Sequence, residues 1–213
     1  MEAFFNKNVV IVGGGRGIGR DLAMEFARLR ANIFLIHDVR EELQDTEHHI
    51  GNMKVRIYGY LCNFLDQKHI NKIITLFKRE FLYADVLINS LEIGQKDLFF
   101  KYTADEIEET LSTELLSQIR ITNLLYGDMV ERKQGTVVNI ESIDYNKTDN
   151  ILAGIYSNSM QALSNGINDF ASGAGMNNLF SLYVSRSFKN YYSTENSDKI
   201  VKAVERRKEF IRL

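Results

Sequence analysis

The chain alternates short runs of apolar residues with longer stretches in which apolar residues recur every three or four positions. The short runs are typical of strands buried in a parallel sheet, and the longer stretches are typical of helices that bury one face. The first run, 9–12, is followed by a helical pattern. The other runs that predict strands are 33–36, 54–61, 86–88, 136–140 and 179–184.

Helical patterns separate these predicted strands. Thr103 and Glu106 form a capping box that begins a long helix running towards Arg132. A further helix is expected to open at Tyr156, and Ser197 is expected to cap a terminal amphipathic helix. The charged stretch 40–50 is compatible with a weak helix or a solvated linker.

Strands that alternate with helices predict an α/β fold with right-handed crossovers. We expect a doubly wound parallel sheet (Rossmann) of six or seven strands, with residues 1–213 forming a single domain.

Composition narrows the classes of function. Of the 213 residues, 45% are hydrophobic, and the net charge of −2 leaves no basic stripe for nucleic acid or an anionic membrane. A signal peptide and a membrane-spanning run are not apparent, and the single cysteine, Cys62, fits a reducing compartment, so a cytoplasmic protein is expected. The pair His48 and His49 lacks a suitably spaced third ligand, so no metal site is expected.

The turn after the first strand, Gly13 to Gly19, is rich in glycine and precedes a helix. Glycine permits a tight turn with positive φ and lets a ligand approach the backbone, and the N-terminus of a helix attracts anions. This arrangement predicts a phosphate cradle.

The chain resembles the short-chain dehydrogenase/reductase family over nearly its full length. The resemblance rests on the turn Val12 to Gly19, on Asn89-Ser90-Leu91-Glu92 after the fourth strand, on Ser142 after the fifth, and on Tyr156. It implies catalytic roles for Ser142, which would hold the substrate oxygen, and Tyr156, which would exchange a proton while a nicotinamide passes hydride.

The resemblance implies a bound NAD or NADP. The implied cofactor contacts are Gly13, Gly15, Arg16, Gly17, Ile18, Gly19, Asp38, Asn63 and Asn89. Asp38, at the end of the second strand, favours NAD because an acidic residue there takes the ribose hydroxyls. Arg16 and Arg40 keep NADP open.

Several positions depart from the family pattern. Met160 stands in place of the family's lysine, and Glu114 stands in place of an asparagine of its proton relay. Leu91 and Glu92 replace two small residues beside the cofactor, and Ser185-Arg186 replaces Pro-Gly before a shortened C-terminal substrate region. A unit charge ~4 Å from a tyrosine is worth about 4 kcal/mol at an effective dielectric of about 20, so losing the lysine leaves a poor base.

Two hypotheses follow from these departures. The first is a catalytically impaired member of the fold, a pseudoenzyme that acts as a nucleotide-binding or partner subunit. The second is a working NAD(P)-dependent oxidoreductase that reduces a carbonyl or oxidises an alcohol through Ser142 and Tyr156. The resemblance also implies a homo- or hetero-oligomer formed through the long helix, about 103–132, and the helix opened by Tyr156.

Overall fold

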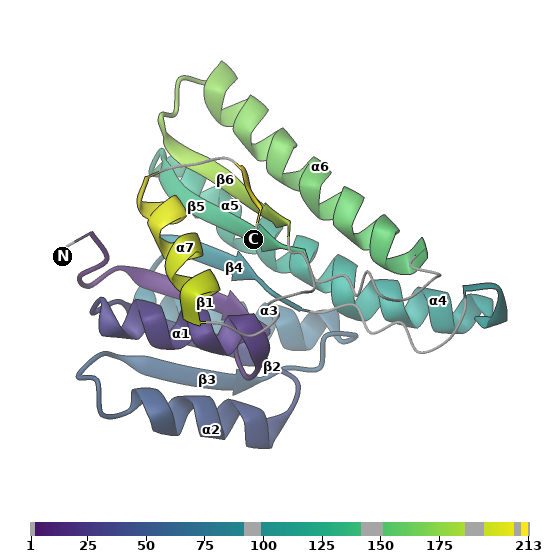
Figure 1. Ribbon diagram of the computed structural model, residues 1–213, viewed down its shortest axis with the longest axis horizontal. Helices are drawn as coiled ribbons and strands as arrows, with labels where there is room; N and C mark the ends of the chain where they lie inside the picture. The colour runs from purple at the N-terminus through teal and green to yellow at the C-terminus, as the bar shows by residue number, and fades with distance from the viewer. Residues whose placement is uncertain (1–2, 92–98, 142–150, 186–193, 207–209, 213) are drawn as a thin grey trace.

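The computed structural model describes residues 3–91, 99–141, 151–185, 194–206 and 210–212 (Figure 1). Its described strands form one parallel sheet of seven, in the order β3-β2-β1-β4-β5-β6-β7. The strands are β1 (Asn8–Val12), β2 (Asn32–His37), β3 (Ile57–Leu61), β4 (Val86–Asn89), β5 (Gln134–Ile140), β6 (Asn178–Ser185) and β7 (Phe210–Arg212). The predicted doubly wound α/β fold is confirmed.

Helices cover both faces of this sheet. They are α1 (Gly17–Arg28), α2 (Arg40–Ile50), α3 (Gln67–Phe81), α4 (Ala104–Leu111), α5 (Ser117–Glu131), α6 (Ile151–Gly173) and α7 (Thr194–Glu205). One core cluster joins α1, α2 and α7 to the sheet, and a second joins α3, α5 and α6 to its other face. Figure 1 shows α1 and α7 in front of the strands and α3 behind them. In the part of the chain that the structure describes, every helix is too short or too polar to cross a membrane.

The strand order reverses between β1 and β4, which lie side by side with Val12 opposite Asn89. In open parallel sheets the crevice beyond the carboxyl ends of two such strands is the usual place for a ligand. The glycine turn that follows β1 and residues Ser90 and Leu91 that follow β4 therefore face each other across the switch point.

The long predicted helix is present, and its capping box is confirmed. Thr103 accepts a hydrogen bond from the backbone of Glu106, whose side chain in turn accepts from the backbone of Thr103. A π-helical turn, Ser112–Leu116, interrupts the regular hydrogen bonding between α4 and α5. Glu114 lies inside that turn, at the carboxyl edge of the sheet.

Several predicted boundaries differ from the structure. Residues 40–50 form the regular helix α2, because Leu43, Thr46 and Ile50 bury one face of it. Helix α6 begins at Ile151, before Tyr156, since Leu152 and Ala153 are already buried. Helix α7 begins at Thr194, so Ser197 lies within it.

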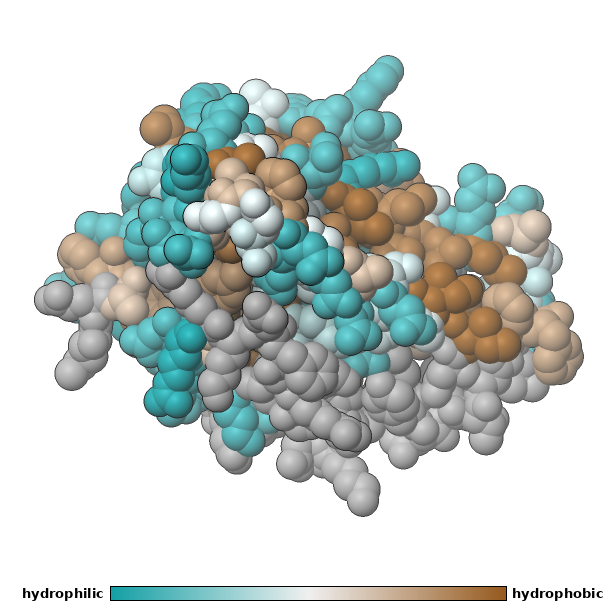
Figure 2. All heavy atoms as spheres, turned by 90° about the horizontal axis from the view of Figure 1, so that it is seen from above, coloured by the Kyte–Doolittle hydropathy of each residue, from teal (hydrophilic) through white to brown (hydrophobic). Residues whose placement is uncertain are grey.

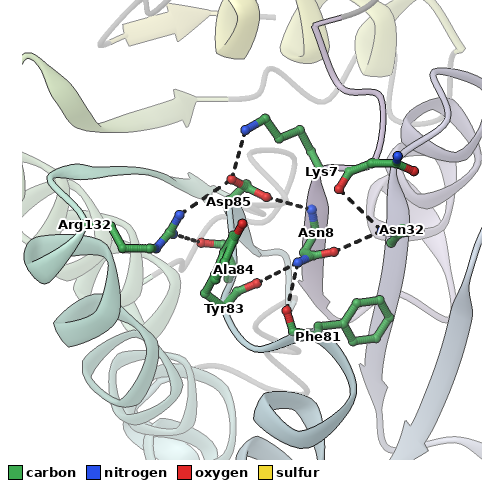
Figure 3. Close-up of polar contacts among 9 residues, drawn as sticks. Lys7, Asn8, Asn32, Phe81, Tyr83, Ala84, Asp85 and Arg132 are labelled. Atoms are coloured by element: carbon green, nitrogen blue, oxygen red, sulfur yellow. Dashed lines mark hydrogen bonds and ion pairs between the residues drawn. The ribbon is translucent and has the colours of Figure 1, made fainter.

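A buried polar network lies at the opposite, amino edge of the sheet, and we call Lys7, Asn8, Asp85 and Arg132 the amino-edge clasp (Figure 3). The Asp85 carboxylate accepts from the backbone of Asn8 at 2.9 Å and from Lys7 Nζ at 3.2 Å, and Arg132 Nη1 lies 3.7 Å away. The Asn8 amide donates to the carbonyls of Phe81 and Tyr83. This network ties β1 to the segment that leads into β4.

Candidate functional site

The glycine turn has the backbone of a phosphate cradle. Gly13 and Gly17 have φ values of +86° and +54°, a region that favours glycine. A Cβ on Gly13 would lie 2.9 Å from the backbone of Ser90, so the turns after β1 and β4 meet without space for a side chain. Arg16, the residue at the N-cap of α1, makes no side-chain capping hydrogen bond. The first amides of α1 therefore keep the orientation that suits an anion.

Gly15 leaves space for the side chain of His37 rather than for a ligand. A Cβ on Gly15 would lie 2.2 Å from Cδ2 of His37, so the imidazole ring rests directly on this glycine. His37 ends β2 and is 2% exposed, and its Nε2 lies 2.6 Å from Oε2 of Glu42 in α2. Thr46 donates to the Gly15 carbonyl at 3.1 Å. Helix α2 is thus fastened to the glycine turn.

A small cavity of about 50 Å³ opens between these elements at the carboxyl edge. It is lined by Gly13, Arg16, His37, Asp38, Phe64, Ser90, Leu91, Thr113 and Glu114. The structure therefore brings the predicted cofactor residues Gly13, Arg16 and Asp38 together. Arg16 is more than half exposed and lies 3.8 Å from Oε1 of Glu42.

Other predicted cofactor residues lie away from this cavity. The Asn89 side chain is fully buried and donates to Thr122 at 2.9 Å and to Asn139 at 2.8 Å, so it joins β4 to α5 and β5. Ile18 packs into the core, and Asn63 is exposed, with its side chain accepting from the backbone of Leu65. Gly19 packs against the Gly13 carbonyl.

Tyr156 is fully buried, and the described part of the chain places three groups close to its hydroxyl. It donates to the Leu91 carbonyl at 2.9 Å, accepts from Nε2 of Gln118 at 3.1 Å, and lies 3.4 Å from the Ile140 carbonyl. The Gln118 side chain also accepts from the Leu91 backbone at 3.2 Å and donates to the Glu114 carbonyl. Gln118 therefore links the turn after β4, the π-helical turn and the tyrosine.

Met160 follows Tyr156 by one helical turn and is fully buried. It belongs to the same apolar cluster as Leu115, Leu152 and Tyr183. A thioether supplies neither a positive charge nor a strong hydrogen bond. The predicted catalytic residue Ser142 lies outside the described residues, as do Glu92 and Arg186.

Cys62 follows β3 beside this edge of the sheet and is buried. Burial, followed by the negative charges of Asp38 and Asp66, raises the pKa of its thiol from 9.0 to about 12. The thiol is neutral at physiological pH, which makes it a poor nucleophile.

The sequence did not lead us to assign Gln118, Glu42 or His37 to this site. Gln118 follows Glu114 by four residues on a predicted helix, which places both on one face. His37 directly precedes Asp38, and a histidine at the carboxyl end of a predicted parallel strand indicates a residue at the ligand-binding edge of the sheet. Glu42 carried no such signal, because its role depends on how α2 docks against the glycine turn.

The chain belongs to the short chain dehydrogenase family, whose sequence model matches residues 7–177. It is 26% identical over 136 residues to epidermal retinol dehydrogenase 2 of Mus musculus, covering 63% of this chain and 44% of that protein. It is 25% identical over 152 residues to a fatty acyl-CoA reductase of Acinetobacter baylyi, covering 67% of this chain and 51% of that protein. The chain thus spans about half the length of these curated relatives.

Solved structures share the fold. A metagenomic short-chain oxidoreductase in complex with NADP superposes with a TM-score of 0.83 at 17% identity, covering 99% of this chain and 98% of that one. An NAD⁺-bound xylitol dehydrogenase superposes with a TM-score of 0.74 at 19% identity, covering 86% and 70%. At this level of identity the likeness establishes the architecture of the sheet and its helices.

Proposed function

We propose that this protein binds NAD(P), or the adenosine and phosphate half of it, and does not transfer hydride. In this role it is a nucleotide-binding or partner subunit. The observation that carries the proposal is the burial of the Tyr156 hydroxyl in hydrogen bonds to Leu91 and Gln118, with Met160 in place of a cation one turn away.

The tyrosine geometry argues against proton exchange with a substrate. A general acid or base must reach the reacting atom within hydrogen-bond distance. The Tyr156 hydroxyl donates its proton to a backbone carbonyl, and the side chain is fully enclosed. A substrate oxygen would have to displace both the Leu91 carbonyl and the Gln118 amide.

The glycine turn supports retained nucleotide binding. Its positive φ values, the uncapped start of α1 and the adjoining cavity fit a phosphate group and part of a ribose. A solved structure of the same fold is a complex with NADP, and another is bound to NAD⁺. When bound, such a cofactor would supply hydride chemistry, and among the described residues Met160 stands where a cation would assist it.

A working NAD(P)-dependent oxidoreductase is the second candidate. Its support is family membership and the names of the relatives, a retinol dehydrogenase and a fatty acyl-CoA reductase. Tyr156 lies beside Leu91 at the carboxyl edge of the sheet, where that reaction would take place. In this case a small-molecule carbonyl or alcohol is the substrate.

The partner role is supported by the outer surface of α5 and α6. Among the 23 residues of α6, only Asp169 is charged, and Ile151, Ile155 and Phe170 are 41–49% exposed. A groove of about 370 Å³ runs between the two helices, and Figure 2 shows a broad brown, hydrophobic area on the side of the molecule where α6 lies. Apolar surface of this extent commonly marks a subunit contact. The proposal therefore includes a homo- or hetero-oligomer, in a reducing cytoplasmic setting that suits Cys62.

The test is to titrate the purified protein with NADH and NADPH, following nucleotide fluorescence, and then to assay carbonyl reduction. We expect binding of at least one nucleotide without turnover, and size-exclusion chromatography of the same sample should show an oligomer. Met160→Lys is the informative variant, because it places a positive charge one helical turn from Tyr156, where the family has a lysine.

Two results would contradict the proposal. Absence of binding at millimolar nucleotide would rule out the oxidoreductase and the nucleotide-binding role, and would leave only the partner role. Carbonyl reduction by the unmodified protein that is abolished in Tyr156→Phe would establish the working oxidoreductase instead.

A further inference from the structure

One long edge of the sheet is formed by β3, which pairs with β2 alone among the described strands. The backbone groups of Arg56 and Cys62 are hydrogen-bonded to β2. Alternate residues of a strand direct their backbone groups to the same side, so Ile57, Gly59 and Leu61 direct theirs away from β2. These three residues therefore form a free edge to which another strand could pair.

The sequence of β3 favours such pairing. Residues 57–61 read Ile-Tyr-Gly-Tyr-Leu, without a charged residue or a proline, and each of them is partly exposed. Short uncharged segments rich in β-branched and aromatic residues pair readily with other chains when they lie at an open edge. Natural sheets usually protect such a strand with a charge or a covering side chain. A protective group is therefore expected beside β3.

Glu47 of α2 lies against the middle of this free edge. Helix α2 runs beside β3 (Figure 1), and Oε1 of Glu47 accepts a hydrogen bond from the backbone N–H of Gly59 at 2.8 Å. A Cβ on Gly59 would lie 2.6 Å from Cδ of Glu47, so the glycine leaves the space that the carboxylate fills. The central N–H of the edge is thus bound within the chain and is closed to another strand.

The charge of Glu47 adds a second obstacle to pairing. Within the described part of the chain this carboxylate makes no ion pair, so its negative charge is not compensated by a neighbouring cation. A second copy that paired antiparallel about Gly59 would bring the two Gly59 Cα atoms about 5.5 Å apart. The two carboxylates would then lie close together and repel each other, and each would lose its N–H.

We propose that Glu47 prevents the edge of β3 from pairing with a second copy of this chain. The side chain occupies the N–H that an added strand would need, and it repels the same side chain of the other copy. The inference is independent of nucleotide binding and of a contact through α5 and α6, because β2, β1 and β4 separate β3 from β5 and β6.

The test is Glu47→Ala, with the assembly state measured by sedimentation velocity. Opening the edge should produce a species of at least roughly twice the mass of the unmodified assembly, since an edge that pairs with its own copy forms a two-fold contact. Glu41→Ala is the matched control. It removes one negative charge from an exposed position in the first turn of the same helix, and it should leave the mass unchanged.

Hydrogen exchange separates strand pairing from loosened packing of α2. If two copies pair through β3, the backbone N–H groups of Ile57, Gly59 and Leu61 should be protected from exchange in the larger species of Glu47→Ala. If α2 has only loosened, the Gly59 N–H should exchange faster than in the unmodified protein. Adding Gly59→Pro to Glu47→Ala should return the mass to that of the unmodified protein, because proline removes the central N–H of the free edge.

Three results would overturn the inference. An unchanged mass in Glu47→Ala would mean that the edge stays closed without Glu47. An equal rise in mass in Glu41→Ala would assign the effect to net charge. A larger species that leaves the N–H groups of residues 57, 59 and 61 unprotected would place the contact elsewhere on the molecule. Circular dichroism of each variant confirms that a change in mass is not a loss of folding, and titration with NADH tests the proposed function separately.

Discussion

The two edges of the sheet differ in how completely the acceptors and donors of one buried side chain, Asp85 or His37, are paired. At the amino edge, both oxygens of Asp85 have partners (Figure 3). The guanidinium of Arg132 lies 4.0 Å over the Tyr83 ring, and its buried Nε has no hydrogen-bond partner among the described residues. At the carboxyl edge, Nδ1 of His37 is buried without a hydrogen-bond partner among the described residues, and the adjoining helix α1 has no side-chain cap. Buried polar groups are usually hydrogen-bonded, so the unpaired His37 nitrogen is notable because it lies beside the cavity at the carboxyl edge.

Two parts of the carboxyl edge, the glycine turn and the surroundings of Tyr156, also differ from each other. Around the glycine turn α1 has no side-chain cap and Nδ1 of His37 has no partner among the described residues, whereas around Tyr156 the hydroxyl is paired with Leu91 and Gln118. The tyrosine end of the crevice therefore resembles the amino-edge clasp more than it resembles the phosphate cradle. This difference is the reason for our proposal that nucleotide binding is retained and catalysis is not.

The largest expected effect comes from breaking the amino-edge clasp. Asp85→Ala removes a carboxylate that is 8% exposed and leaves Arg132 and the backbone N–H of Asn8 without it. Removing one partner of a buried ion pair costs about 3 kcal/mol or more, so the free energy of unfolding in urea should fall by that amount. Lys7→Ala is the control, because Lys7 is 38% exposed and its ion pair contributes under about 1 kcal/mol. An equal loss in the free energy of unfolding in the two variants would contradict the conclusion that Asp85 stabilises the clasp more than Lys7 does.

Tyr156→Phe should have a smaller but distinct effect. It leaves the Leu91 carbonyl and the Gln118 amide without the hydroxyl, at a cost of about 1–2 kcal/mol in the free energy of unfolding. A tyrosine that points into an open active site would lose almost nothing in this measurement.

Tyr126→Phe provides the matched control for this variant. The Tyr126 hydroxyl is buried without a hydrogen bond in the described part of the chain, and burial raises the pKa of this tyrosine. Removing a buried hydroxyl that lacks a partner should leave stability unchanged or raise it. If Tyr156→Phe changes the free energy of unfolding as little as Tyr126→Phe does, the Tyr156 hydroxyl does not stabilise the crevice.

Sequence patterns predicted the fold well because burial is periodic along the chain. The apolar runs predicted the strands, and the capping box at Thr103 predicted the start of α4. Both features depend on residues that are close in sequence. The depth of Tyr156 was not predictable, since it depends on Leu91 and Gln118, which lie 65 and 38 residues away. The same holds for the contact between Gly15 and His37, which arises only when β2 ends beside the turn.

The smallest expected effect concerns Cys62 at the carboxyl edge. Since burial and then Asp38 and Asp66 raise the pKa of its thiol to about 12, the folded state keeps a proton that the unfolded state loses above pH 9. The free energy of unfolding should therefore fall as the pH rises from about 9 towards 12. Urea unfolding at pH 8 and pH 10.5 measures this loss, and Cys62→Ala should show a shallower decline than the unmodified protein. Tyrosines that titrate in the same range affect both proteins equally, so the difference isolates the thiol. Identical declines would mean that Cys62 is not shielded, and a reaction of the folded protein with a thiol reagent at pH 8 would agree with that result.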